Sequence, residues 1–171
     1  TNFKQSLSDV DKQSFSKYQA LVSLLKNDEK SLDSEFVWDK KDPEDRLVIF
    51  TESRQTLAFL AQHLPPDLGL KDTQFCVLKG DDSDKDLMDK VERFNKLESP
   101  IRLMLATDVA SEGLNLHRLC HRLIHFDIPW SLMTFQQRNG RIDRYGQQKK
   151  PIIRYLQTDV KTTAGKCIGD N

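Results

Sequence analysis

Hydrophobic positions along the chain follow two alternating patterns. Short continuous apolar runs, which are typical of strands buried on both faces, predict strands at 46–50, 75–78, 101–106, within 119–126, and at 152–156. Helical spacing of apolar residues lies before and between these runs, at 16–26, at 57–64 and at Leu87, Val91, Phe94 and Leu97. We expect Pro65-Pro66 to end the second of these helices.

This order of elements predicts one α/β domain in which a parallel sheet is covered by helices on both faces, a three-layer arrangement. Right-handed crossovers then bring the carboxyl ends of the strands to one edge, where ligands bind in such folds. We interpret 1–15 as a polar lead-in, 16–157 as the domain, and 158–171 as a polar tail that is disordered or cut from a longer chain. Within the polar loop 27–45, the cluster Phe36-Val37-Trp38 either caps the core or docks a partner.

Composition narrows the classes of partner. The chain has 26 Lys+Arg and 26 Asp+Glu, so contact with nucleic acid requires a local basic patch. No apolar run approaches the length of a membrane span, and no signal-peptide pattern opens the sequence. Three cysteines without metal-site spacing indicate reduced thiols in a cytosolic protein. The four histidines show no metal-ligand pattern, and we interpret His125 as a core residue in a strand.

The stretch 137–147 has the strongest chemical signal. If it is helical, Gln137, Arg141 and Arg144 point within about 60° of one another, at 100° per residue. Ser131 would be the N-cap and Gly146 the C-cap. The opposite face would hold the apolar residues Leu132, Phe135 and Ile142, together with Asn139, whose amide has no evident role there. The simplest alternative is a solvated basic face.

Three polar segments follow predicted strands and should meet at one edge of the sheet. Thr51-Glu52-Ser53-Arg54 combines hydroxyls, helix N–H groups and a guanidinium, which suits a phosphate, although a plain helix cap is an equal alternative. Lys79-Gly80 offers a cation and an open backbone. The segment 107–116 brings a hydroxyl, a carboxylate and a glycine, or is a loop with a capping Asp.

The spacing Q-x-x-G-R-x-x-R-x-G-Q at 137–147 resembles the last motif of superfamily-two helicases and translocases. The trailing Gly146-Gln147 narrows the resemblance to Swi/Snf-type DNA translocases, especially bacterial members. The segments after the earlier strands resemble other motifs of the C-terminal RecA-like lobe of this family, and the resemblance covers 16–157. Ser111-Glu112 replaces a glycine-rich version of the 107–116 loop found in many eukaryotic remodellers, which favours the bacterial branch.

The resemblance implies a role for each matching residue. Arg141 and Arg144 would face the γ-phosphate of ATP as arginine fingers. Thr107 and Asp108 would couple the nucleic-acid path to the nucleotide. Other residues near ATP would be Gly113, Asn115 and Gln137, and those along the nucleic-acid backbone Ser53, Arg54, Lys79 and Gly80. The implied partners are double-stranded DNA and an N-terminal RecA-like lobe, with no membrane, in the cytoplasm at the bacterial nucleoid.

Two parts of an ATPase are missing from the sequence. No G-x-x-x-x-G-K-[ST] phosphate loop occurs, and no predicted strand ends in the Asp-Glu pair that holds Mg²⁺. We therefore expect this chain alone to hydrolyse ATP negligibly, and a first lobe to supply the phosphate loop and Mg²⁺. The chain itself is predicted to hold no metal.

Three other functions remain open. The chain could be the same lobe of an RNA helicase, against which Gly146-Gln147 argues. It could be a non-catalytic docking module for protein or nucleic acid, which would have no need of both arginines. An unrelated Rossmann-like enzyme is disfavoured because no G-x-G-x-x-G follows the first strand.

Overall fold

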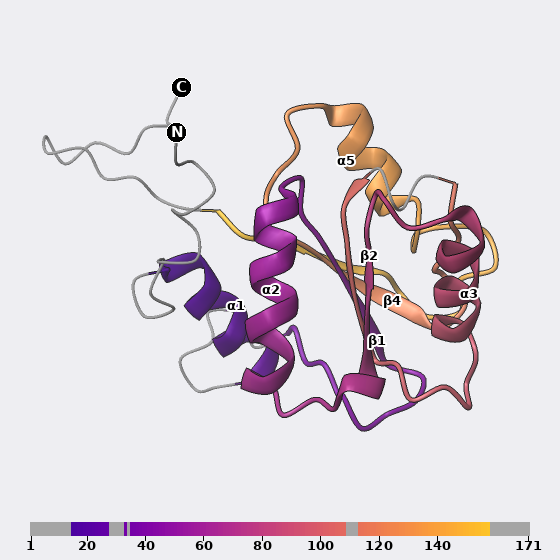
Figure 1. The fold of residues 1–171 in the computed structure, drawn as a ribbon, viewed down its shortest axis with the longest axis horizontal. Helices are drawn as coiled ribbons and strands as arrows, with labels where there is room; N and C mark the ends of the chain where they lie inside the picture. Colours follow the sequence, from indigo (N-terminus) through magenta and orange to yellow (C-terminus); the bar gives the residue numbers. More distant parts are fainter. Residues whose placement is uncertain (1–14, 28–32, 34, 109–112, 158–171) are drawn as a thin grey trace, which may run out of the picture.

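A computed structural model of the chain describes residues 15–27, 33, 35–108 and 113–157. The predictions for 1–14, 109–112 and 158–171 therefore lie outside the described residues. Five parallel strands form one sheet in the order β2-β3-β1-β4-β5 (Figure 1). They are β1 (Arg46–Phe50), β2 (Phe75–Leu78), β3 (Leu103–Ala106), β4 (Cys120–His125) and β5 (Ile152–Tyr155). The predicted α/β class and all five strands are confirmed.

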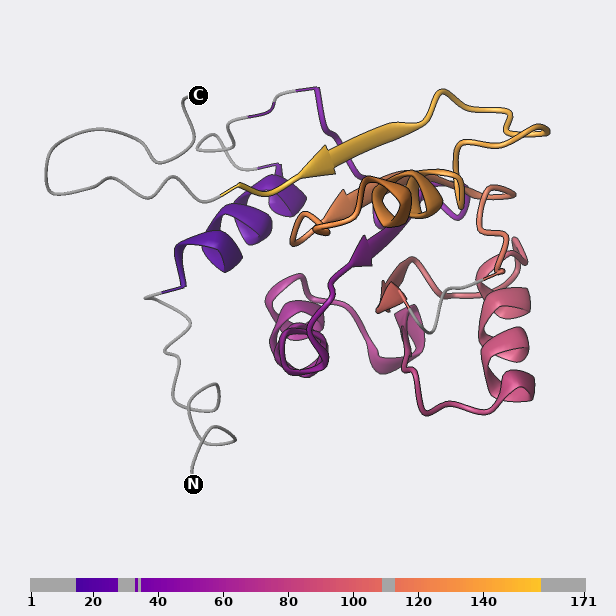
Figure 2. The ribbon, with the colours of Figure 1, turned by 90° about the horizontal axis from the view of Figure 1, so that it is seen from above.

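Alternate residues of the central strands enter two separate cores. Leu47 and Ile49 of β1 pack with helices α1 (Ser16–Lys26) and α2 (Arg54–Asp67). Val48 and Phe50 pack on the opposite face with Phe94 of α3 (Asp84–Phe94) and with Ile142. Figure 2 shows α1 and α2 on one side of the sheet and α3 on the other. This is the predicted three-layer arrangement.

Serine caps begin three of the helices. Ser53, Ser83 and Ser131 each accept a hydrogen bond from the backbone N–H three residues later, at the starts of α2, α3 and α5 (Leu132–Asn139). The N–H groups of a helix's first turn have no partner within the helix, so each cap stabilises its helix start where the helix leaves the sheet edge. The prediction of Ser131 as an N-cap is confirmed.

Pro65 and Pro66 do not end α2, contrary to the prediction. The helix continues to Asp67 because Leu64 and Pro65 are buried against the core, which outweighs the backbone preference before proline. Their carbonyls instead accept the bonds that close the helix, from Leu70 N to Pro65 O and from Gly69 N to Pro66 O.

Two further details of the predicted pattern are corrected, and one open alternative is decided. Leu97 lies beyond the end of α3 and is 45% exposed, so it is not part of that helix's apolar stripe. Leu132, predicted to face the core, is 80% exposed. The Phe36-Val37-Trp38 cluster caps the core, because Phe36 and Trp38 are buried and Trp38 Nε1 donates to Asp45 O at 3.0 Å.

The arginine-rich stretch is only partly helical. Helix α5 ends at Asn139, with Gly140 as its C-cap, and Arg141 and Arg144 lie on the turns that follow. Gly146, with φ of +95°, forms a later turn and is not the helix cap. The prediction that Arg141 and Arg144 point the same way because they share one helical face is therefore wrong, since neither residue lies in α5.

A buried guanidinium holds α5 to the sheet. Arg138 is 2% exposed and forms a bidentate pair with Asp108, Nε to Oδ1 at 2.5 Å and Nη2 to Oδ2 at 2.8 Å. Its Nη1 donates to Asp127 O at 3.0 Å and lies 3.3 Å from His125 Nδ1. The guanidinium also stacks over the Phe50 ring at 5.6 Å. One side chain thus joins α5 to the ends of β1, β3 and β4.

His125 and Asn139 complete this network. A guanidinium can only donate, so His125 Nδ1 accepts and its Nε2 carries the proton, which it donates to Asn139 Oδ1 at 2.8 Å. Burial lowers the pKa of His125 by more than the hydrogen bond to Asn139 raises it. The ring is therefore held neutral. The interpretation of His125 as a satisfied core residue is confirmed, and Asn139 has its role.

The two described cysteines are inert. Cys76 and Cys120 are free thiols, and burial raises the pKa of each to about 12.

A second buried arginine, Arg46, joins the amino end of the sheet to the end of α3. The guanidinium of Arg46 donates to the carbonyls of Arg93, Phe94 and Lys96 at the end of α3, where the helix dipole favours a cation. Burial lowers the pKa of Arg46 to about 10.

We expect Arg46→Met to lower the free energy of unfolding by roughly 2–4 kcal/mol, because several buried carbonyls lose a charged donor. Arg118→Met, at an exposed arginine, is the matched control and should change it by less than about 0.5 kcal/mol. Urea unfolding of both variants measures this, and equal stability of the two would contradict the structural role of Arg46.

Acid should destabilise the chain through His125. Its folded-state pKa lies below the unfolded value of about 6.5, so below that pH the unfolded state binds a proton that the folded state lacks. The free energy of unfolding should fall from about pH 6.5 toward the folded pKa, by at most about 1.4 kcal/mol per pH unit per histidine. His121, whose pKa burial also lowers, adds to this. His125→Gln should roughly halve the slope in urea unfolding at several pH values, and an unchanged slope would refute the assignment.

Candidate nucleotide and nucleic-acid site

Polar groups gather at the carboxyl ends of the strands, as parallel topology requires. Thr51 follows β1, Lys79 follows β2, Thr107 follows β3 and Asp127 lies just beyond β4. Asp127 accepts bonds from Thr51 Oγ1 at 2.5 Å and from Glu52 N at 2.9 Å. The ends of β1 and β4 are thereby fixed to each other at this edge.

The two predicted arginine fingers contact the segment that follows β3. Arg144 donates from Nη1 to Asn115 Oδ1 and is exposed. Arg141 is half-buried and donates from Nη1 to Leu114 O at 3.2 Å. Its own carbonyl accepts from Leu116 N at 3.0 Å, so the two segments are also joined through the backbone.

The structure therefore brings four of the five predicted nucleotide residues together. Gly113 precedes Asn115 and has φ of +77°, a left-handed conformation that suits glycine, and both are exposed beside the arginines. Gln137 is exposed on α5, one turn before Arg141. Buried Ile142 anchors the turn between the two arginines.

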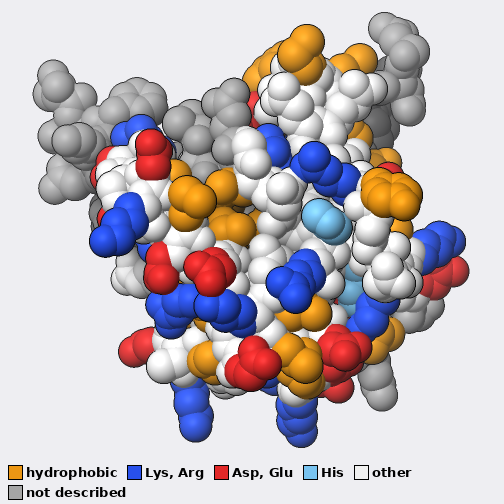
Figure 3. Space-filling view, turned by 90° about the vertical axis from the view of Figure 1, so that its right-hand side faces the viewer, with side chains coloured by type: hydrophobic (Ala, Val, Ile, Leu, Met, Phe, Trp, Pro, Cys, Tyr) orange, Lys and Arg blue, Asp and Glu red, His pale blue; other side chains and the backbone are white. Residues whose placement is uncertain are grey.

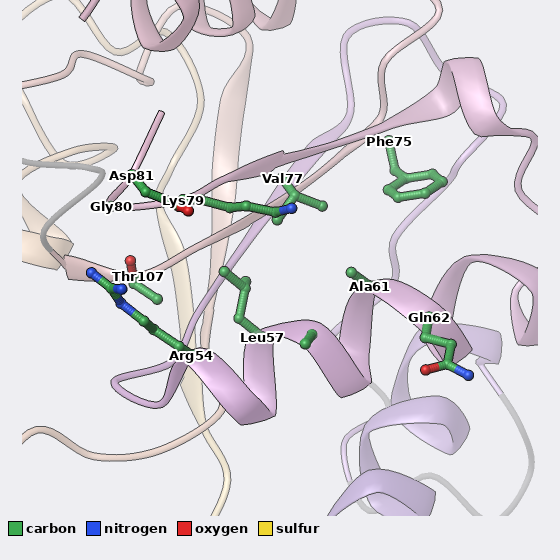
Figure 4. Close-up of a pocket in the computed structure, with 11 residues that line it drawn as sticks. Arg54, Leu57, Ala61, Gln62, Phe75, Val77, Lys79, Gly80, Asp81 and Thr107 are labelled. Carbon is green, nitrogen blue, oxygen red and sulfur yellow. The ribbon is translucent and has the colours of Figure 1, made fainter. Parts of the chain in front are cut away.

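The predicted nucleic-acid residues fall into two groups. Arg54, Lys79, Gly80 and Thr107 line one pocket at the edge of the sheet (Figure 4). In this view the Arg54 side chain extends toward Thr107.

Ser53 and Asp108 have different surroundings. The hydroxyl of Ser53 caps α2, accepting from Thr56 N at 3.2 Å, so this side chain plays the capping role that the sequence left open. Asp108 turns toward Arg138, and its side chain is 27% exposed.

Sequence reasoning missed Arg138 and Asp127. Their partners are remote in the chain: Asp108 lies 30 residues from Arg138, and Thr51 lies 76 residues from Asp127. The only local signal was an arginine next to an unexplained asparagine in an amphipathic stretch.

The loop before α5 and the first turn of that helix carry exposed apolar side chains. Trp130 is 99% exposed, Leu132 80%, Met133 67% and Ile128 46%. In Figure 3, hydrophobic side chains stand at the top of the molecule, the level of α5, above a face where both charge signs are interspersed. Such a patch beside a polar edge is typical of a surface that has a partner.

The donor set at Arg141, Arg144 and Asn115 fits a polyphosphate but supplies only one side of a site. Two guanidiniums and an amide can hydrogen-bond phosphate oxygens in fork geometry. Within the described ranges, no cluster of three metal-ligating His, Cys, Asp or Glu side chains occurs. None of the described helices is long and apolar enough to span a bilayer.

Known proteins are similar to this chain in sequence and fold. The family "Helicase conserved C-terminal domain" matches residues 16–146. The "Uncharacterized ATP-dependent helicase YqhH" of Bacillus subtilis is 33% identical over 117 residues, which is 67% of this chain and 19% of that protein. The "Probable ATP-dependent RNA helicase DDX43" of Homo sapiens is 31% identical over 97 residues, 57% of this chain and 14% of that protein.

A solved structure agrees. The C-terminal part of the Fun30 ATPase domain superposes with a TM-score of 0.65 at 25% identity, covering 82% of this chain and 40% of that one. The chain thus spans less than a fifth of the two curated relatives' length. With a five-stranded parallel RecA-like sheet and a family match over 16–146, the chain belongs to the helicase conserved C-terminal domain family.

Proposed function

We propose that this chain is the second motor lobe of an ATP-dependent DNA translocase. The observation that carries the proposal is the convergence of Arg141 and Arg144 on the 113–116 segment, which Asn95 Nδ2 also holds through Asn115 O at 2.9 Å. Cations in fork geometry on this segment fit the terminal phosphates of a nucleotide held by another lobe.

The two arginines have different parts in the proposal. Arg144 is exposed and its amide partner Asn115 is also exposed, so its guanidinium can exchange that bond for phosphate oxygens. Arg141 is braced by Leu114 O and by the buried Ile142 beside it, so it presents its donors with little loss of freedom. ATP supplies the phosphoryl group whose developing charge these donors stabilise.

Arg54, Lys79, Gly80 and Thr107 form the proposed nucleic-acid track, with Ser53 contributing at the start of α2. Two cations at the mouth of one pocket give the local basic site that a chain of zero net charge requires. The pair of Asp108 with Arg138 links this track to α5, whose end carries Arg141. This pair is the proposed coupling between the two sites.

A first lobe would complete the site. It would bring the phosphate loop and the Mg²⁺ ligands that this sequence lacks, as part of a longer protein. The exposed Trp130 side chain just before α5 would offer stacking surface to a partner.

DNA is the proposed polymer because of Gly146-Gln147 and the Fun30 similarity. Gln147 donates to Cys120 O and Ile142 O, both at 3.0 Å, and so secures the turn after Arg144. The second candidate is an RNA helicase lobe, favoured by relatives such as the human protein named an RNA helicase.

The ATPase rate of the full-length parent protein, measured with double-stranded DNA, single-stranded DNA and RNA, tests the proposal. Strong stimulation by duplex DNA is the expected result. Stimulation by RNA alone would support the second candidate, and no turnover under any condition would leave only a docking module.

Arg144→Ala in the parent should slow ATP hydrolysis by a factor on the order of 10³, with a smaller effect on ATP binding, because an arginine finger acts mainly in the transition state. Arg118→Ala removes an exposed arginine elsewhere in the domain and serves as the control. Steady-state turnover and nucleotide titration measure both effects. Near wild-type turnover in Arg144→Ala would remove the residue from the site.

The isolated chain should hydrolyse ATP negligibly, since it has no phosphate loop. Turnover by a highly purified sample that persists in Arg144→Ala would point to a contaminant. Turnover that this variant abolishes would contradict the need for a first lobe.

A further inference from the structure

One face of the edge strand β2 is only partly covered. Phe75 and Val77 point to the α2 side of the sheet and are half-buried, whereas their neighbours Leu103 and Leu105 on β3 are fully buried. The strand cannot readily pair with another strand, because Lys90 Nζ occupies Val77 O at 3.0 Å. In the described part of the chain, the partly covered face of β2 instead borders a hollow between this strand and α2.

This hollow is a pocket of about 570 Å³ with distinct walls and mouth (Figure 4). Its interior walls are mainly apolar: Leu57, Ala58, Ala61, Phe75 and Val77. Figure 4 shows the Phe75 ring and Ala61 toward one end, and Arg54 and Thr107 at the other.

The end of the pocket away from Phe75, here called the mouth, is more cationic than the interior (Figure 4). Arg54, Lys79 and Asp81 line it, with the Gly80 backbone between the last two. Within the described ranges, neither the Arg54 nor the Lys79 side chain forms a salt bridge; Lys79 does help to lower the pKa of the nearby Asp82 carboxyl, which itself pairs with Lys90 at 2.5 Å. Gln62 is the polar residue among the interior walls.

A nucleotide unit has the matching chemistry. Its phosphate fits the cations at the mouth, the flat apolar faces of its base fit an aliphatic and aromatic cavity, and an amide can bond the polar edge of the base. We propose that the pocket receives an unpaired nucleobase from a strand whose phosphates lie on Arg54 and Lys79. This inference rests on the proposed function, which places the strand at the mouth but assigns no site to its bases.

The pocket restricts the substrate class. A base in continuous duplex DNA must leave its stack and its partner to enter, at a cost of a few kcal/mol. A gap, a fork or a single strand offers the base without that cost. The lobe should therefore prefer DNA that contains an unpaired segment, while duplex DNA still contacts the cations at the mouth.

The test uses the full-length protein and two matched exposed positions on α2. Ala58→Phe fills the pocket, whereas Gln55→Phe adds the same side chain at a position that does not line it. The probes are a fluorescent oligothymidylate and an abasic strand of equal length with the same phosphates.

The wild-type protein should bind the base-bearing strand about tenfold more tightly, in the range expected for one stacked base. Ala58→Phe should abolish this preference without weakening the abasic strand, and Gln55→Phe should keep it. Arg54→Ala should weaken both strands.

Each other outcome has a definite meaning. Equal wild-type affinity for the two strands would overturn the base pocket and leave the proposed function standing. A preference that survives Ala58→Phe would move the base site elsewhere. No binding of either strand or of duplex DNA would defeat the proposed function itself. If strands are not distinguished but Ala58→Phe changes the ATPase rate without nucleic acid, the pocket holds a protein segment and the inference is wrong.

Discussion

The buried Arg138 guanidinium is the constraint on which the functional edge depends. A charge removed from water costs several kcal/mol unless it is paired and hydrogen-bonded, and Arg138 is 2% exposed. Asp108 supplies the paired charge, and the Asp127 carbonyl and His125 Nδ1 take further donors. Helix α5 can therefore seat only when the ends of β3 and β4 are both in place. The position of the turns that carry Arg141 and Arg144 therefore depends on the pairing of Arg138 with Asp108.

Elements defined by local pattern could be predicted from the sequence, since burial on one or both faces leaves a period that neighbouring residues reveal. The run Arg46–Phe50 is a strand as expected, although Arg46 is itself buried, because its donors meet carbonyls at the end of α3 nearly 50 residues away. The local rule that a helix ends before proline failed at Pro65, because the packing of Leu64 in the core outweighs the backbone preference. Local signals predicted the elements well, but contacts distant in sequence fixed where α2 ends.

The site shows the same division. The residues that resemble a helicase motif were found by their spacing, and the structure places Arg141, Arg144, Gly113 and Asn115 together. Spacing alone assumed that the helix runs through Arg144. Instead α5 ends at Asn139, whose amide bonds His125, and the arginines lie on turns. No local pattern could reveal this, because the ring that holds Asn139 belongs to β4 and the partner of Arg138 follows β3.

These contacts make the two proposed sites depend on one segment. The segment from Thr107 to Leu116, of which the structure describes 107–108 and 113–116, has Thr107 at the proposed nucleic-acid pocket and 113–116 beside the arginines. Its first end is tied to α5 through Asp108 and Arg138, and its second through the backbone bond from Leu116 N to Arg141 O. A strand that displaces Thr107 must therefore strain the Arg138 pair or move α5 with it, and α5 carries the turn that presents Arg141. In the proposed function, coupling between nucleic acid and nucleotide then requires no long pathway, because each ligand would act at one end of this segment.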